Sequence, residues 1–92
     1  MMKVVLFLGT FWHINKVVLS NVMRVEVERS AYRCFSRKAS LRITTANGDA
    51  YIIKNMKMDV CRDIIEKAEK ESFLDLTVVF DKYIYIAERE NQ

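Results

Sequence analysis

The chain has 92 residues, the size of one compact domain, so we expect residues 1–92 to fold as a single domain. Apolar residues make up 51% of the chain and the net charge is +3, a composition that excludes an intrinsically disordered chain. The basic balance permits binding to nucleic acid or anionic lipid without requiring either.

The first predicted element is a strand at residues 4–8, which are all apolar. Gly9 and Thr10 separate this strand from Phe11 and Trp12. The apolar run is far shorter than the ~20 residues that a membrane-spanning helix needs. A signal peptide begins in a similar way, but no small residues follow in the pattern of a cleavage site. We therefore expect a strand of a cytoplasmic protein.

Strand patterns continue in the next part of the chain. Residues 23–29 alternate, with valines on one side and charged residues on the other, and this period of two predicts a half-buried strand. Residues 17–19 and 31–35 are shorter strand candidates.

A hairpin is predicted where residues 41–46 and 49–54 flank Asn47 and Gly48, because an Asn-Gly pair favours a two-residue type I′ turn. Such a turn requires positive φ angles, which glycine adopts freely, so we expect a structural role for Gly48. With this turn Ile43 pairs with Ile52. The apolar face then consists of Leu41, Ile43, Ala50 and Ile52, and the other face of Arg42, Thr44, Asp49, Tyr51 and Ile53.

Residues 58–71 show the one clear helical period in the sequence. Its apolar stripe consists of Val60, Cys61, Ile64, Ile65 and Ala68. Asp59 is the expected N-cap, and oppositely charged residues four positions apart cover the outer face. The pattern predicts an amphipathic helix with one side on a sheet and the other in water.

Residues 76–80 and 83–87 flank Asp81 and Lys82 and predict a second hairpin. Its strands are apolar on both faces, which is typical of strands covered on both sides. Closure of the sheet into a barrel would provide the second cover, and so would a partner subunit. Together the patterns predict an α+β fold: an antiparallel, strongly curved sheet or partial barrel of six to seven strands, with one amphipathic helix packed on it.

Two segments before the helix read LSNVMRVEVE at residues 19–28 and LRITTANGDAYII at residues 41–53. With the helix, they resemble pleckstrin-homology-like domains of the GRAM and bacterial PH types over about residues 19–70. The resemblance implies a binding module for lipids or proteins, since that family is seldom catalytic. It carries over no binding residue, because the basic loop of the lipid-binding members has no counterpart here. In that family the helix closes the domain, whereas here a hairpin is predicted after it.

A basic segment lies between Arg24 and Arg42, with six cations against two anions. Arginines interleaved with aromatic residues can hold phosphates and stack bases. The same pattern is typical of a solvated strand that resists edge aggregation, and it would also suit an acidic protein surface. All three interpretations stay open. The candidate binding residues are Arg29, Tyr32, Arg33, Phe35, Arg37, Lys38 and Arg42.

Two apolar regions, near the N-terminus and in the second hairpin, exceed what the core of one small domain needs. Strand addition between copies would cover them, so we expect self-association. The candidate residues are Phe7, Phe11, Trp12, Val79, Tyr83 and Tyr85.

The sequence shows no arrangement of catalytic residues. His13, the single histidine, would need Cys34 or Cys61 beside it to form a nucleophile–base pair, and nothing in the pattern brings them together. The two cysteines have neither the spacing of a disulfide framework nor that of a zinc site. We expect free thiols, no metal ion and no cofactor.

The sequence therefore predicts a non-enzymatic, small protein-interaction or regulatory module that self-associates and binds a protein partner. Its compact, proline-free character is also that of regulators and inhibitors encoded by phages and mobile elements. The first alternative is a nucleic-acid-binding protein that uses residues 24–42. The second is an anionic-lipid-binding module of the PH-like kind.

Overall fold

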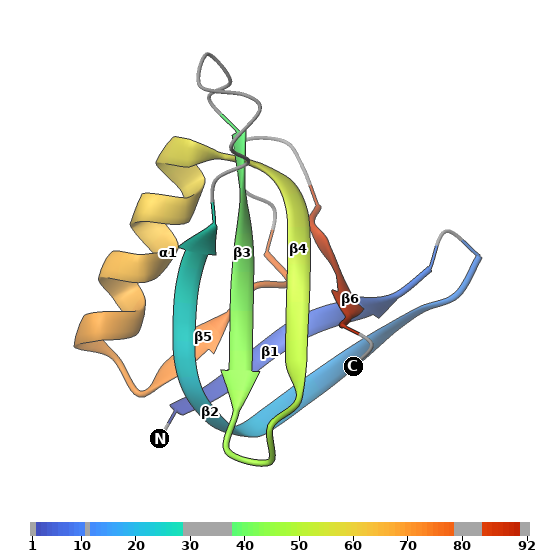
Figure 1. The fold of residues 1–92 in the computed structure, drawn as a ribbon, viewed down its shortest axis with the longest axis horizontal. Helices are drawn as coiled ribbons and strands as arrows, with labels where there is room; N and C mark the ends of the chain where they lie inside the picture. Colours follow the sequence, from blue (N-terminus) through green and yellow to red (C-terminus); the bar gives the residue numbers. More distant parts are fainter. Residues whose placement is uncertain (1, 11, 29–37, 79–83, 91–92) are drawn as a thin grey trace.

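The computed structural model describes residues 2–10, 12–28, 38–78 and 84–90. Within them the chain forms six strands and one helix, a sheet-rich fold of the predicted α+β class (Figure 1). In chain order the elements are β1 (Met2–Gly9), β2 (Ile14–Glu28), β3 (Lys38–Thr45), β4 (Ala50–Lys57), α1 (Met58–Lys70), β5 (Phe73–Asp75) and β6 (Ile86–Arg89).

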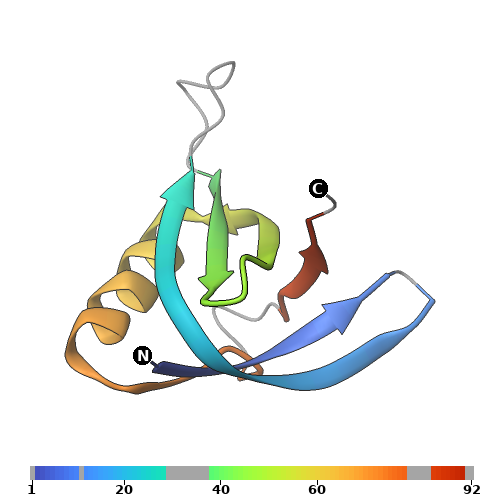
Figure 2. The ribbon, with the colours of Figure 1, turned by 60° about the horizontal axis from the view of Figure 1, so that its bottom comes forward.

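Five of the strands close into a barrel (Figure 2). β1 pairs with β2, β2 with β3, β3 with β4 and β4 with β6, all antiparallel, and β6 pairs with β1 in parallel. A closed ring with an odd number of strands cannot alternate in direction at every step, so one parallel pairing is unavoidable. β5 is an additional strand, parallel to the first part of β1. The predicted antiparallel partial barrel is thus a closed barrel of mixed direction.

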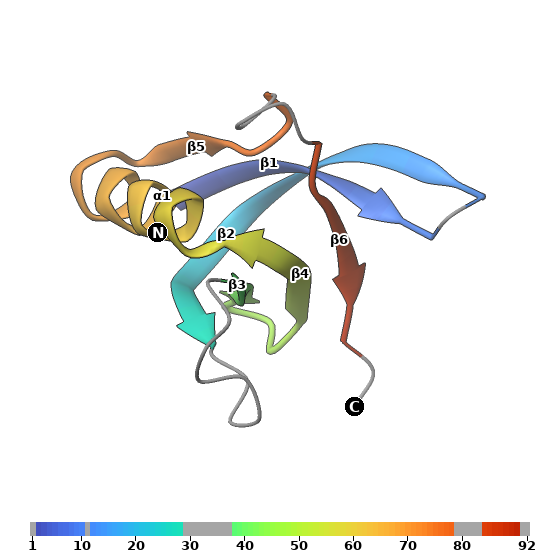
Figure 3. The same ribbon diagram turned by 90° about the horizontal axis from the view of Figure 1, so that it is seen from above.

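The core fills the barrel and continues beneath α1, which packs on β2, β3, β4 and β5 (Figure 3). The helix buries Val60, Cys61 and Ile64, while Ile65 and Ala68 pack at the margin of the core. This confirms the predicted apolar stripe. The largest fully buried side chains are Leu6, Leu41, Ile43, Ile53, Met56, Ile64 and Leu76.

The start of α1 differs from the prediction. β4 passes into the helix without a loop, and Lys57, its last residue, still pairs with Lys38 of β3. Lys57 therefore takes the N-cap position, and Asp59 lies inside the first turn. There its carboxylate still complements the positive end of the helix dipole.

The β3–β4 hairpin exists as predicted, but its two strands pair in a different register. Thr45 accepts a hydrogen bond from the N–H of Gly48 and donates its own N–H to the carbonyl of Asp49, at 3.1 and 2.9 Å. The loop therefore has three residues and ends in Gly48 at φ +88°, the arrangement of a type I turn followed by a glycine bulge. The structural role of Gly48 is confirmed.

The extra loop residue shifts the pairing by one. Ile43 faces Tyr51, and Leu41 faces Ile53. Because side chains alternate along a strand, a shift of one residue exchanges the two faces of β4. The predicted apolar face was therefore wrong in β4: Tyr51 and Ile53 are buried in the core, and Ile52 is half-buried opposite Arg42.

The described parts of the predicted second hairpin do not pair as predicted, and residues 79–83, which include its turn, lie outside the described residues. Residues 76–78 are not a strand, and β5 and β6 each pair with β1. β5 ends where the Asp75 carboxylate accepts hydrogen bonds from the Thr77 N–H and hydroxyl, and this local bonding competes with continued strand pairing.

The strand candidate at 17–19 and residues 23–28 of the next candidate are parts of one long, bent strand, β2, with an irregularity between Val22 and Arg24. Arg29 lies outside the described residues. The candidate at residues 31–35 lies outside the described residues.

Candidate interaction surface

The end of the β1–β2 hairpin extends beyond the barrel (Figures 1 and 3). Residues 7–10 and 12–20 are called the arm here, and Leu19 at the base of the arm still enters the core. β6 pairs with β1 at Phe7 and Leu8, and the hairpin continues past that contact. At its tip Thr10 and His13 exchange two backbone hydrogen bonds of 2.9 and 3.2 Å. A side chain at Gly9 could not be accommodated, because its Cβ would lie 1.8 Å from the carbonyl oxygen of His13.

The two faces of the β1–β2 hairpin, whose end forms the arm, differ. The pairs Val4–Leu19 and Leu6–Val17 share the inner face, where Val4, Leu6 and Leu19 enter the core. The pairs Val5–Val18, Phe7–Lys16 and Gly9–Ile14 share the outer face. On that face Ile14 is 49% exposed and Val18 is 55% exposed, and Trp12 at the tip is 85% exposed.

The arm also has an open strand edge. β2 pairs with β1 along residues 14–22, but its pairing with β3 begins only at Val22. The Asn21 carbonyl accepts a hydrogen bond from Ala46, next to that junction. Among the residues that the structure describes, no strand pairs with the far edge of β2 at residues 14–20.

The structure brings only part of the predicted self-association set to the arm. Phe7 lies there half-buried and Trp12 is exposed at the tip, whereas Tyr85 packs against the core just before β6. Phe11, Val79 and Tyr83 lie outside the described residues. Ile14 and Val18 were missed. The signal was present, since Ile14, Lys16, Val18 and Ser20 alternate with the core-facing residues of the same strand.

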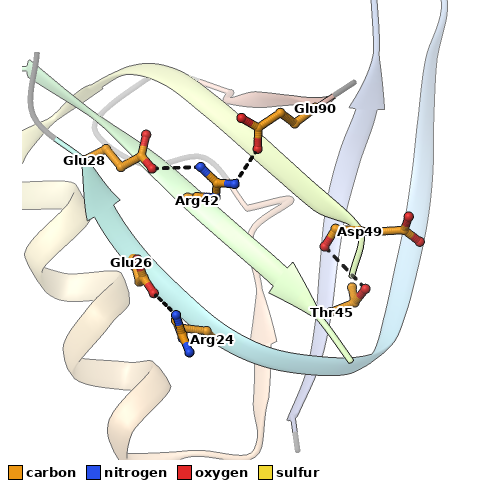
Figure 4. A network of polar contacts seen from close by, with 7 residues as sticks. All are labelled: Arg24, Glu26, Glu28, Arg42, Thr45, Asp49 and Glu90. Carbon is orange, nitrogen blue, oxygen red and sulfur yellow. Dashed lines mark hydrogen bonds and ion pairs between the residues drawn. The ribbon is translucent and has the colours of Figure 1, made fainter. Parts of the chain in front are cut away.

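The candidate basic residues that can be placed are Lys38 and Arg42. Lys38 is exposed at the start of β3. Arg42 lies between two carboxylates, at 3.1 Å from Glu28 of β2 and 2.8 Å from Glu90, which follows β6 (Figure 4). The hydrogen bond that Arg42 donates to the Glu28 carboxylate and the negative charge of Glu90 raise the pKa of Arg42. Arg29, Tyr32, Arg33, Phe35 and Arg37 lie outside the described residues.

Ion pairs continue along the outer surface of the same sheet. Arg24 lies 3.1 Å from Glu26 on β2, and Arg89 of β6 lies 2.8 Å from Asp49. Lys54 and Glu88 approach to 3.6 Å. This surface carries both signs of charge side by side, in the manner of a solvated face.

The residues considered for chemistry are separated. His13 is exposed in the turn of the arm, and Cys61 is buried on α1, where burial raises the pKa of its thiol. Cys34 lies outside the described residues. In the part of the chain that the structure describes, no three His, Cys, Asp and Glu side chains gather closely enough to hold a metal ion. Nor does any helix there combine the length and apolar character that a membrane crossing requires.

No protein-family model matches the chain, and no match was found among curated proteins or solved structures. The arm and the ion-paired outer surface of the sheet are the two features of the described residues that bear on function.

Proposed function

We propose that the protein is a small, non-enzymatic protein-interaction module that self-associates through the arm. The observation that carries this proposal is the exposure of apolar side chains on the arm, where Ile14 and Val18 of the outer face are about half exposed and Trp12 at the tip almost fully so. Apolar side chains that lie close together on an exposed element can form a site of protein–protein contact.

The energetics favour covering these side chains. Burying a Val or Ile side chain completely stabilises by about 1.5–3 kcal/mol relative to full exposure. Only part of that free energy remains after the loss of rotational and translational freedom on association. Because Ile14 and Val18 are about half exposed, each can gain about half of that amount, so several such side chains have to be covered together to offset the cost of association.

The basic segment supports the nucleic-acid alternative less well. Of its cations, Arg24 and Arg42 are engaged by carboxylates, so a phosphate would have to displace Glu26, Glu28 or Glu90. The paired charges are those of a sheet surface facing water.

Light scattering behind a sizing column tests the proposal, with absorbance recorded at 260 and 280 nm. We expect the wild-type protein to have a mass that is a multiple of 10.8 kDa and to carry no nucleic acid. A variant with Ile14→Thr and Val18→Thr should be monomeric, because threonine keeps the branched shape and strand preference but loses apolar surface.

The matched control carries Val78→Thr and Ile84→Thr, which are 50% and 57% exposed and lie outside the arm. We expect this control to assemble as the wild type does. If the control is monomeric and the arm variant still assembles, the interface lies at Val78 and Ile84 rather than in the arm. A wild-type monomer at all concentrations would refute self-association, and a peak rich in 260 nm absorbance that salt removes would favour the nucleic-acid alternative.

A further inference from the structure

We propose that a second copy of this chain adds its own β2 to the open edge of β2, antiparallel, with Val17 of both copies on a twofold axis. The pairing would join the two arms into one continuous four-stranded sheet. This inference rests on the proposed function and names the partner, the edge and the register.

The backbone of β2 is prepared for such a pairing. Thr10 and His13 exchange both of their hydrogen bonds, and in an antiparallel pair this pattern repeats at every second residue. The N–H and C=O groups of Asn15 and Val17 therefore point to β1. Those of Ile14, Lys16 and Val18 point to the open edge, and these three residues are exposed. Ser20 is exposed as well and lies next to the point where the β1–β2 register shifts, beyond the Val4–Leu19 pair.

The usual protections of a free edge are scarce here. Natural edges carry prolines, several charges or bulges that block pairing with another chain. Between Ile14 and Ser20 there is no proline and a single charge, Lys16, and Ile14, Val17 and Val18 are β-branched. Seven residues of strand are about 23 Å long. Such an edge is open to pairing with another strand.

A second copy offers an open edge of the same length, residues 14–20, and charge does not oppose its pairing. The edge has no acidic residue and one cation, Lys16. A register that keeps Lys16 of one copy away from Lys16 of the other avoids repulsion without an acidic partner. Centring the pair on residue 16 would place Lys16 directly opposite Lys16 of the other copy, which is destabilising. Centring it on Val17 places Lys16 opposite Val18, and Ile14 opposite Ser20.

The register centred on Val18 is excluded because part of the β2 edge that it needs already pairs with β3. Centring the pair on Val18 would place Ile14 opposite Val22, whose edge is already taken by Thr45 of β3. Only the register centred on Val17 uses residues 14–20 of both copies in full. It provides about eight backbone hydrogen bonds. The twofold axis is perpendicular to the sheet, so that the exposed Ile14 and Val18 of both copies share one face.

A proline substitution tests the edge itself. Lys16→Pro removes an N–H that points away from β1, a position at which a strand tolerates proline. We expect this variant to keep the barrel, as judged by circular dichroism and thermal unfolding, and to be monomeric in light scattering. Lys16→Gln removes the charge but keeps the N–H, and it should assemble at least as well as the wild type.

Cysteine cross-linking tests the register, in a protein that carries Cys34→Ser so that Cys61, which is buried, is the one other thiol. Val17→Cys places two thiols at the axis, where a disulfide can form. Ile14→Cys is the matched control, since its two copies would lie about 20 Å apart. Mild oxidation should give a covalent dimer with Val17→Cys and none with Ile14→Cys.

The outcomes separate the two proposals. If the wild type assembles but Lys16→Pro assembles equally and Val17→Cys does not cross-link, edge pairing is wrong and the arm acts through its outer face alone. If the wild type is a monomer at every concentration, both proposals fail. Should Lys16→Pro not fold, the contrast between Val17→Cys and Ile14→Cys decides.

Discussion

The thiol of Cys61 is closed off from solvent on the inner side of α1, and burial raises its pKa. Both effects oppose reaction, because the thiolate is the reactive form. In the protein with Cys34→Ser, we expect Ellman's reagent at pH 8 to label Cys61 only as fast as α1 opens. Labelling should accelerate with urea and be rapid in the unfolded chain. Rapid labelling of the native protein would show that the helix is loosely packed.

Asp75 makes the stability of the fold depend on pH. The Thr77 hydroxyl and then the Thr77 N–H donate to its carboxylate, at 2.5 and 2.9 Å, and they lower its pKa below the usual value. A carboxyl with a lowered pKa stabilises the fold at neutral pH, and this stabilisation is lost as the pH falls through its folded pKa.

We therefore expect Asp75→Asn to lower the free energy of unfolding at pH 7, and the difference from the wild type to shrink toward pH 3. Urea unfolding at both pH values measures it. A difference that is equal at both would mean that the charge of Asp75 contributes nothing. Thr77→Val provides a second check, because it removes the hydroxyl donor and should also reduce the pH dependence.

At the scale of elements, the register of β4 decides which of two neighbouring isoleucines supports the core. Ile53 is fully buried opposite Leu41, whereas Ile52 lies half-buried on the outer surface. We expect Ile53→Ala to cost about 2–5 kcal/mol in the free energy of unfolding. Ile52→Ala should cost clearly less. Guanidinium unfolding of the two variants compares them directly. A larger loss of stability in Ile52→Ala than in Ile53→Ala would support the register of the two-residue Asn-Gly turn instead.

The β3–β4 hairpin shows what sequence patterns can and cannot fix. The Asn47-Gly48 pair locates the turn, because Gly48 adopts a positive φ of +88° that few other residues accept. A two-residue turn and a three-residue loop both place glycine there, and the choice is made by the fit of Tyr51 and Ile53 in the barrel. That fit depends on strands distant in sequence, so local preference could not reveal it.

The other elements also divide into those that a local pattern reveals and those that depend on strands distant in the sequence. The period of residues 58–71 was enough for α1, since an amphipathic stripe depends on the helix alone. β5 and β6 were misplaced because each is held by β1, far away in the sequence, rather than by the other. The arm was missed because its exposed edge follows from where β3 stops pairing with β2.

At the scale of the whole molecule, Arg42 connects elements that are distant in sequence. Its guanidinium contacts Glu28 of β2 and Glu90 beyond β6, across the outer surface of the barrel (Figure 4). Ion pairs at a surface are weakened by salt. We expect Arg42→Gln to destabilise the protein modestly at low salt, with a difference in melting temperature that disappears in 1 M NaCl.

The same variant bears on nucleic-acid binding. If Arg42 serves the barrel, Arg42→Gln should leave the affinity for an oligonucleotide and its salt dependence unchanged. A shallower slope of log affinity against log salt concentration would instead show that Arg42 contacts a phosphate. Fluorescence anisotropy with a labelled oligonucleotide at several salt concentrations distinguishes these results.

The position of Trp12 has a spectroscopic consequence. It is the single tryptophan of the chain, and it stands at the end of the arm rather than in the barrel. The indole emission of the folded monomer should therefore resemble that of free tryptophan in water and should change little when the core melts. It will shift to shorter wavelength only when something covers the arm. The protein thus carries its own reporter of contact at the tip, which says almost nothing about whether the rest of the molecule is folded.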